Sequence, residues 1–324
     1  MRALLLTACL ISSVATSALA EVSITKSPAG WELTNGHVRI ELALASGEVH
    51  LKSLRREGGT EWAVANTALV ASPDKSGKPY QFAEDAISDL EKGGKQLTLR
   101  FRSDAGGVLS LQLKLYPNGA VVQMAMQLEN RGKHDLILDS HIDPLFLTLN
   151  NPAVGLKPYS SMKGQHGFQR TEQLGQAREF PDWVVLENEE VGESMLVGGE
   201  PGLGVLGWKA EVQSAAGGTA IRAGTILIKD KKSGPAASFE LAPGNVVETP
   251  ISFFALARGD SDNAGNEAFR YLKQYVFLAP LPDSPLVTYC IWLTEKNSEG
   301  PLLKELDLAK RCLLYTSPSP RDTR

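Results

Sequence analysis

The chain has 324 residues, of which 43% are hydrophobic and 22% are charged, and its formal net charge is −4. Acidic and basic residues are interspersed, which excludes the basic surface of a nucleic-acid-binding protein and a polybasic patch for a membrane surface. Of the three cysteines, Cys9 lies in the predicted signal and Cys312 in the predicted artefactual tail, both described below, so Cys290 alone remains and a disulfide framework is excluded. Burial of a large core must therefore stabilise the fold.

The amino terminus has the pattern of a secretory signal. Arg2 precedes the apolar run LLLTACLISSVA, and Ala18-Leu19-Ala20 forms a small-residue cleavage site. We therefore expect residues 1–20 to be removed, with Glu21 as the mature start and a secreted or periplasmic location. The segment LTAC also resembles a lipoprotein box with Cys9 as lipid acceptor, which is the alternative. No later stretch reaches the ~18 to 20 apolar residues of a membrane span.

Strand patterns fill the next part of the chain, from about Trp31 to Leu256. QLTLRFR (Gln96–Arg102) and VLSLQLKLY (Val108–Tyr116) alternate apolar and polar residues, as strands with one buried face do. Turn residues such as Pro117-Asn118-Gly119 follow them, which indicates antiparallel hairpins. The sequence therefore predicts a mainly β fold, a large antiparallel β-sandwich over residues 21–258.

A linker helix is predicted after the sandwich, within residues 259–282. Asp260 or Ser261 can cap it, and Pro280 and Pro282 lie beyond its end. Its apolar stripe consists of Ala264, Ala268, Leu272 and Val276.

A second domain is expected to begin near residue 283. The segment LVTYCIWL (Leu286–Leu293) is apolar nearly throughout, which is typical of a strand buried on both faces. A helix is predicted to follow from Pro301, because proline suits the first helical turn. Residues 283–311 are thus interpreted as one strand and one helix of a βα-repeat domain.

The last residues, 312–324, are Ser/Pro-rich and fit neither a helix nor a core strand. One choice of codons for CLLYTSPSPRD spells a transposon-type sequencing-library adapter. We therefore interpret this tail as an adapter-derived artefact and the reading frame as cut short. A natural disordered tail is the alternative.

Three patterns suggest chemistry but have simpler explanations. Residues 202–207 match the nucleotide-binding motif G-x-G-x-x-G, but the strand pattern WKAEVQ follows them where the motif requires a helix. His141 and Asp143 share one strand face and could contribute to a metal site, but the other histidines lack metal-motif spacing. Glycosidic hydrolysis needs paired carboxylates, yet the acidic run of Glu187, Glu189 and Glu190 is more typical of a solvated loop or edge strand.

Three tryptophans, Trp183, Trp208 and Trp292, are predicted at strand ends or loop edges and are the candidate substrate-binding residues. An aromatic ring offers apolar area to the CH-rich face of a sugar without removing water from its hydroxyl groups. Core packing is the alternative for each ring. Trp292 lies near the carboxyl end of the first strand of a βα unit, where barrel enzymes place their sites.

Three stretches resemble the glycoside hydrolase family 36 alpha-galactosidases. They are the region from DWVVLEN to GLGVLGWKAE, the segment FFALARGDSDNAGNEAFRYLKQYV, and PLVTYCIWLTEKNSEGPLLKELDLAKR. The resemblance implies a galactose-mutarotase-like β-supersandwich before a catalytic (β/α)₈ barrel, cut after its first βα unit. It also implies a retaining hydrolase of alpha-linked galactose or related sugars, whose two catalytic aspartates lie on later barrel strands that this chain lacks.

Only Trp292 matches a sugar-contacting position of that family. Cys290-Ile291 and Leu293-Thr294 replace the Asn-Ser/Thr and Glu that more usually flank this tryptophan, so the substrate can differ within the group.

The leading hypothesis is an amino-terminal fragment of an exported alpha-galactosidase-like hydrolase, itself without catalytic residues, metal or cofactor. A carbohydrate is the expected partner, and the oligomeric state is open. One alternative is a carbohydrate-binding or structural sandwich. The other is a mutarotase-like sugar epimerase using a His/Glu pair that includes His141 or His166.

Overall fold

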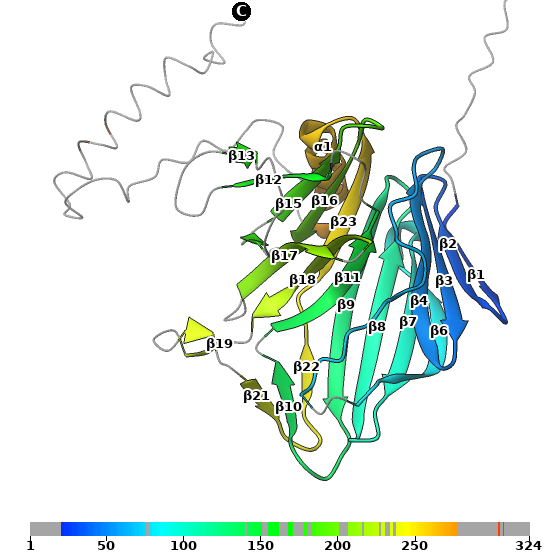
Figure 1. The fold of residues 1–324 in the computed structure, drawn as a ribbon, viewed down its shortest axis with the longest axis vertical. Coiled ribbons are helices and arrows are strands. Elements are labelled where there is room, and N and C mark those ends of the chain that lie inside the picture. The colour runs from blue at the N-terminus through cyan, green and yellow to red at the C-terminus, as the bar shows by residue number, and fades with distance from the viewer. Residues whose placement is uncertain are drawn as a thin grey trace, which may run out of the picture. The chain divides into compact units, whose positions relative to one another are not determined.

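The computed structural model shows a protein built almost entirely of antiparallel β-sheet (Figure 1). It divides into two compact units, Met1–Phe277 and Leu278–Arg324, and the fold below is that of the first. The predicted strand Leu286–Leu293 lies outside the described residues, as do the start of the helix at Pro301 and the tail. The structure describes residues 21–75, 78–139, 141–150, 155–161, 168–170, 178–180, 183–200, 207–215, 217–226, 228–230, 234–235 and 238–277, together with Lys304 and Asp307.

The first sheet is a five-stranded meander, and alternation explains its two faces. Val38, Ile40 and Leu42 of β3 point into the core, while Arg39 and Glu41 lie between them on the other face. Its strands are β1 (Ser23–Ser27), β2 (Gly30–Thr34), β3 (Val38–Ala45), β4 (Glu48–Arg56) and β5 (Thr67–Ala68).

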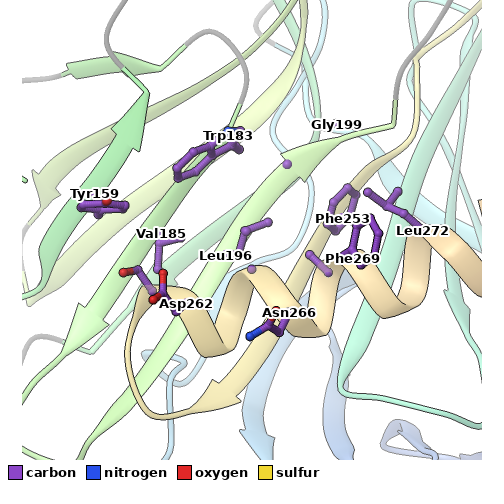
Figure 2. Close-up of a pocket in the computed structure, with 14 residues that line it drawn as sticks. Tyr159, Trp183, Val185, Leu196, Gly199, Phe253, Asp262, Asn266, Phe269 and Leu272 are labelled. Carbon is purple, nitrogen blue, oxygen red and sulfur yellow. The ribbon is translucent and has the colours of Figure 1, made fainter. Parts of the chain in front are cut away.

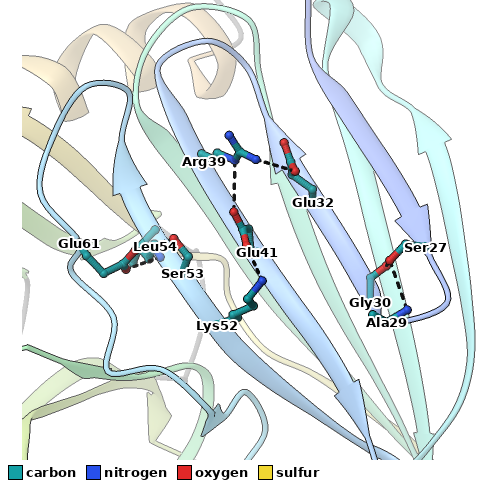
Figure 3. Close-up of polar contacts among 10 residues, drawn as sticks. All are labelled: Ser27, Ala29, Gly30, Glu32, Arg39, Glu41, Lys52, Ser53, Leu54 and Glu61. Atoms are coloured by element: carbon teal, nitrogen blue, oxygen red, sulfur yellow. Dashed lines mark hydrogen bonds and ion pairs between the residues drawn. The ribbon is translucent and has the colours of Figure 1, made fainter.

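Ion pairs lie on the solvent face of this meander (Figure 3). Arg39 contacts Glu32 at 2.8 Å and Glu41 at 3.4 Å, and Lys52 contacts Glu41 at 3.0 Å. The hydrogen bond from Lys52 lowers the pKa of Glu41, although burial opposes it. The contacts from Arg39 to Glu32 and from Lys52 to Glu41 join neighbouring strands and so support the register of β2, β3 and β4, whereas the Arg39–Glu41 contact lies within β3.

The largest sheet has ten strands and contains the hairpins predicted from the sequence. Leu97 pairs with Leu113 and Leu99 with Leu111 in antiparallel register, which confirms the predicted strands. The strand order is β13-β12-β15-β16-β23-β9-β8-β7-β6, with β22 also paired to β9. The bounds are β6 Gln81–Asp89, β7 Lys95–Arg102, β8 Gly107–Leu115, β9 Val121–Asn130, β12 Lys157–Ser161, β13 Phe168–Arg170, β15 Trp183–Asn188, β16 Glu193–Gly199, β22 Val246–Glu248 and β23 Ser252–Arg258.

A third, four-stranded sheet has the strand order β11-β18-β17-β14. Together with the meander it forms the layer opposite the ten-stranded sheet. The remaining strands form two-stranded ribbons, β10 with β21 and β19 with β20, and a short 3₁₀ turn, η1, covers Glu91–Gly93. The bounds are β10 Leu136–Asp139, β11 His141–Leu149, β14 Arg178–Phe180, β17 Gly207–Ala215, β18 Gly218–Ile226, β19 Ile228–Asp230, β20 Gly234–Pro235 and β21 Ser238–Leu241.

One continuous core lies between the ten-stranded sheet and the two smaller sheets. Leu33 of the meander, Leu111 of the large sheet and Ile221 of the four-stranded sheet are all fully buried members of it. Because apolar side chains from facing sheets share this core, the molecule is a β-sandwich, as predicted.

The predicted linker helix is present as α1 (Ser261–Tyr271), and a π-helical turn, η2 (Leu272–Val276), continues it. Asp260 caps the helix and accepts a hydrogen bond from the Asn263 amide at 3.3 Å. Ala264 and Ala268 of the predicted stripe are buried. None of the helices in the described part of the chain has the length and apolar character needed to cross a membrane.

Candidate functional site

A groove lies between helix α1 and the outer face of the ten-stranded sheet, the face turned away from the main core (Figure 2). Its volume is about 570 Å³, within the ~300–1,000 Å³ range of small-molecule sites. The sheet side is lined mainly by Tyr159, Trp183, Val185, Leu196 and Phe253, which come from β12, β15, β16 and β23.

Strands β15 and β16 are apolar on both faces, and the structure explains why. Val184 and Leu186 enter the main core, whereas Val185 packs with Leu196 and with Ala264 of the helix in a second buried cluster. Successive side chains of a strand point to opposite faces, so only a sheet covered on both sides buries all of them. Helix α1 provides the second cover.

Polar contacts hold the amino-terminal end of α1 on the sheet. A carboxylate oxygen of Glu187 accepts a hydrogen bond from the Ser261 amide at 2.9 Å, and the Ser194 hydroxyl donates to the Asp260 carbonyl at 2.7 Å. Glu267 of the helix accepts from the Ala120 amide at 2.8 Å. The bond from the Ser261 amide satisfies a donor that the start of a helix would otherwise leave unpaired, and the other two tie α1 to β16 and to the loop before β9.

A buried network holds the other end of the helix. Glu200 accepts hydrogen bonds from the Tyr271 hydroxyl and from the Gln123 side-chain amide, the latter at 2.6 Å. Burial raises the pKa of Glu200, and the hydrogen bonds from Tyr271 and Gln123 partly offset this effect. Burial also raises the pKa of Tyr271, and the neighbouring Glu200 carboxylate adds to it.

The groove combines aromatic and polar side chains. The Tyr159 and Trp183 rings have centroids 6.2 Å apart and planes tilted by 40°. Ser261, Asp262 and Asn266 of α1 provide the polar part of the lining. Figure 2 shows the two rings above the helix, with Asp262 and Asn266 on it. An apolar site with a few placed polar groups is the usual form of a small-molecule site.

A second, more polar pocket of about 650 Å³ shares Tyr159 and Ser261 with the groove. Its lining includes carboxylates of Glu187, Glu189, Glu193 and Asp260. The solvated loop that we predicted for the acidic run is correct for Glu189 and Glu190, which are exposed. It is wrong for Glu187, which is buried because it binds the start of α1.

Trp208 lies on the other side of the sheet from the groove. Its indole nitrogen donates to the Ser252 hydroxyl at 3.0 Å, and its ring packs against the main core. Only glycine fits beside it, since a Cβ on Gly199 would lie 2.6 Å from the ring. The structure thus brings Trp183 to the groove but not Trp208, and Trp292 lies outside the described residues. The sugar contacts of all three remain predictions.

His141 and Asp143 lie side by side on β11, with Nδ1 of His141 2.9 Å from an Asp143 oxygen. Both side chains are 11% exposed, at a β-bulge between Ile142 and Leu145. Gly224 faces the bulge, where a Cβ would lie 1.9 Å from the Ile142 carbonyl oxygen. Among the residues that the structure describes, no three His, Cys, Asp or Glu side chains gather to hold a metal, and His166 lies outside that set.

Sequence reasoning missed the structural carboxylates Glu187 and Glu193. The capping residues Asp260 and Ser261 predicted a helix start. They did not predict that Glu187, on a strand distant in the sequence, accepts a further hydrogen bond from that helix start. The residues of the groove were also missed as a group, although Trp183 itself was singled out.

The fold and the groove define a two-layer antiparallel β-sandwich with a helix on its outer face. No protein-family model matches the chain, and comparison with curated proteins gives no match. Solved alpha-galactosidases of glycoside hydrolase family 36 do match it in structure. AgaB from Geobacillus stearothermophilus is 14% identical with a TM-score of 0.58, over 76% of this chain and 42% of that one.

Two further structures match to a similar extent. The galactosidase domain of the alpha-galactosidase-sucrose kinase AgaSK is 11% identical, with a TM-score of 0.58 over 73% of this chain and 42% of that one. The alpha-galactosidase from Lactobacillus brevis is 11% identical, with a TM-score of 0.57 over 75% and 41%. The chain thus spans about two fifths of these proteins, and the resemblance noted in the sequence is confirmed at the level of the fold.

Proposed function

We propose that the chain is the amino-terminal sandwich of an exported retaining glycoside hydrolase that acts on alpha-galactosides or related alpha-linked sugars. The observation that carries the proposal is the match of about three quarters of the chain to about two fifths of solved alpha-galactosidases. Residues 1–20 would direct export to the periplasm or the medium, and Trp292 would contact the sugar in the catalytic domain.

Two buried carboxylates of the sandwich, Glu187 and Glu193, have structural roles. A retaining glycosidase needs two carboxyl groups ~5–5.5 Å apart on either side of the scissile bond. Glu187 holds the start of α1, and Glu193 accepts from the Thr60 amide and the Trp62 indole. These two buried carboxylates are therefore engaged in holding the fold, and the proposal assigns the nucleophile and the acid/base to a catalytic barrel domain and not to the sandwich.

The test is to read the gene downstream of the codon for Arg311. Further βα units with two suitably placed aspartates, and release of galactose from an aryl alpha-galactoside by the complete protein, would support the proposal. A stop codon at that point would refute it and leave a carbohydrate-binding or structural sandwich. A complete barrel that cleaves other alpha-linked sugars but no alpha-galactoside would refute only the galactoside part.

A further inference from the structure

The lining of the groove beside α1 points to a ligand. Its aromatic pair, Tyr159 and Trp183, comes from two hydrogen-bonded strands, β12 and β15. The rings are 6.2 Å apart and tilted by 40°, so together they form a shallow angled surface and not a closed stack. Such a surface fits the CH-rich faces of pyranose rings, which gain apolar contact while their hydroxyl groups stay hydrated.

The helix side of the groove supplies polar groups at a suitable spacing. Asp262 and Asn266 are four residues apart on α1, so they lie on one face of the helix, and both line the groove. A carboxylate offers two acceptor oxygens, and an amide offers one acceptor and two donors. Together they can bind several hydroxyl groups of a sugar whose apolar face rests on the rings.

The negative charge of the carboxylates in and beside the groove favours a neutral ligand. The start of α1 would attract an anion through its free amides, but Asp260 and Glu187 already accept hydrogen bonds from the Asn263 and Ser261 amides. The carboxylate of Asp262 in the groove adds further negative charge, as do those in the adjoining pocket. A phosphorylated or carboxylated ligand would therefore be repelled.

The adjoining pocket extends the site. It shares Tyr159 and Ser261 with the groove, so a ligand lying on Tyr159 reaches both spaces, of about 570 and 650 Å³. That continuity fits several linked sugar rings better than one.

We propose that this groove binds a neutral oligosaccharide, with Trp183 and Tyr159 as the stacking surface and with Asp262 and Asn266 binding hydroxyl groups. The site is formed by strands of the sandwich together with helix α1, and the inference does not rest on the hydrolase proposal.

The experiment titrates the full chain with stachyose and maltohexaose, which are neutral, and with glucose 6-phosphate as a charged control. Binding is measured by calorimetry and by tryptophan fluorescence. Trp31 and Trp62 are each 3% exposed and Trp208 packs on the core, so Trp183 is the described tryptophan that the ligand would reach. We expect at least one neutral oligosaccharide to bind and to change the fluorescence.

Three substitutions test the residues. Trp183→Ala should weaken binding about tenfold or more, a factor that corresponds to ~1.4 kcal/mol. Trp183→Phe should retain binding within about threefold while losing most of the fluorescence change. Asn266→Ala should weaken binding several-fold, whereas Ile137→Ala, an exposed apolar residue on β10, should match the unsubstituted chain. If Trp183→Ala fails to fold, Asn266→Ala and Trp183→Phe still decide the question.

Absence of binding by both neutral sugars at millimolar concentration would overturn the proposal. Equal binding by Trp183→Ala, or tighter binding of glucose 6-phosphate, would also overturn it. Concentration-dependent dimerisation that Trp183→Ala abolishes, without sugar binding, would assign the groove to a second copy of the chain instead. Sugar binding together with a stop codon after Arg311 would support the groove proposal and refute the hydrolase proposal. No sugar binding together with further βα units after Arg311 would refute the groove proposal and support the hydrolase proposal.

Discussion

Glu193 gives the sharpest test of how the two layers are joined. It lies at the start of β16 in the ten-stranded sheet and is 5% exposed. Its carboxylate accepts from the Thr60 amide at 3.2 Å and from the Trp62 indole nitrogen at 3.1 Å, both in the segment that links β4 to β5 of the meander. Replacing Glu193 by Ala therefore leaves two donors without their partner at the junction of two sheets.

The expected cost follows from those two bonds. A hydrogen bond to a charged group contributes ~1.5–3 kcal/mol net, and distances of 3.1–3.2 Å are at the long end of the normal range, so each bond is taken near the lower value. Glu193→Ala should lower the free energy of unfolding by about 3 kcal/mol. At ~2–4 °C per kcal/mol for a domain of this size, Tm should fall by about 6–12 °C.

A double-mutant cycle makes the test specific. Trp62→Phe removes the N–H donor together with part of the buried ring, so it should cost about 1.5 kcal/mol for the hydrogen bond plus the loss of packing in urea unfolding. In the Glu193→Ala background the same change should cost about 1.5 kcal/mol less, because only the packing loss remains once the donor is already unpaired. Asp104→Ala, at an exposed turn residue, is the control and should be neutral. A Glu193→Ala variant within ~0.5 kcal/mol of the parent, or additive effects in the cycle, would refute the reasoning.

Three further predictions concern stability measured by urea unfolding. Burial raises the pKa of Glu200 above its ordinary value of 4.5, so the folded chain holds this proton more tightly than the unfolded chain. Stability should therefore fall as pH rises from 4.5 through the raised pKa, and Glu200→Gln should flatten that slope; an unchanged slope would contradict the assignment. Gly224→Ala places a Cβ 1.9 Å from the Ile142 carbonyl oxygen and should cost about 3 kcal/mol or more. Gly217→Ala in the same hairpin meets open space and should cost only the ~1–2 kcal/mol of its positive φ; equal costs would argue against the clash. Asn130→Ala removes two donations, to the His134 and Leu241 carbonyls, and one acceptance from the Gly132 amide, and should cost about 3 kcal/mol; a loss below ~1 kcal/mol would show that these groups find other partners.

The sequence determined the elements whose signals are local. Alternation in 96–102 and 108–116 specified strands with one buried face, and turn residues between and after them specified antiparallel pairing. Asp260 and the stripe from Ala264 specified the helix and its start. These signals come from residues a few positions apart, so they do not depend on the rest of the fold.

Only the tertiary structure determined which strands are neighbours and which of their side chains meet. The strand order β12-β15-β16-β23 brings Tyr159, Trp183 and Phe253 to one face, and α1 then covers that face to form the groove. The same arrangement buries Glu187 and Glu193 and separates Trp183 from Trp208. Alternation along a strand shows that successive side chains point to opposite faces of the sheet. It does not show which strands pair with it or which face of the sheet a helix will cover. The groove depends on both, so no local pattern could predict it.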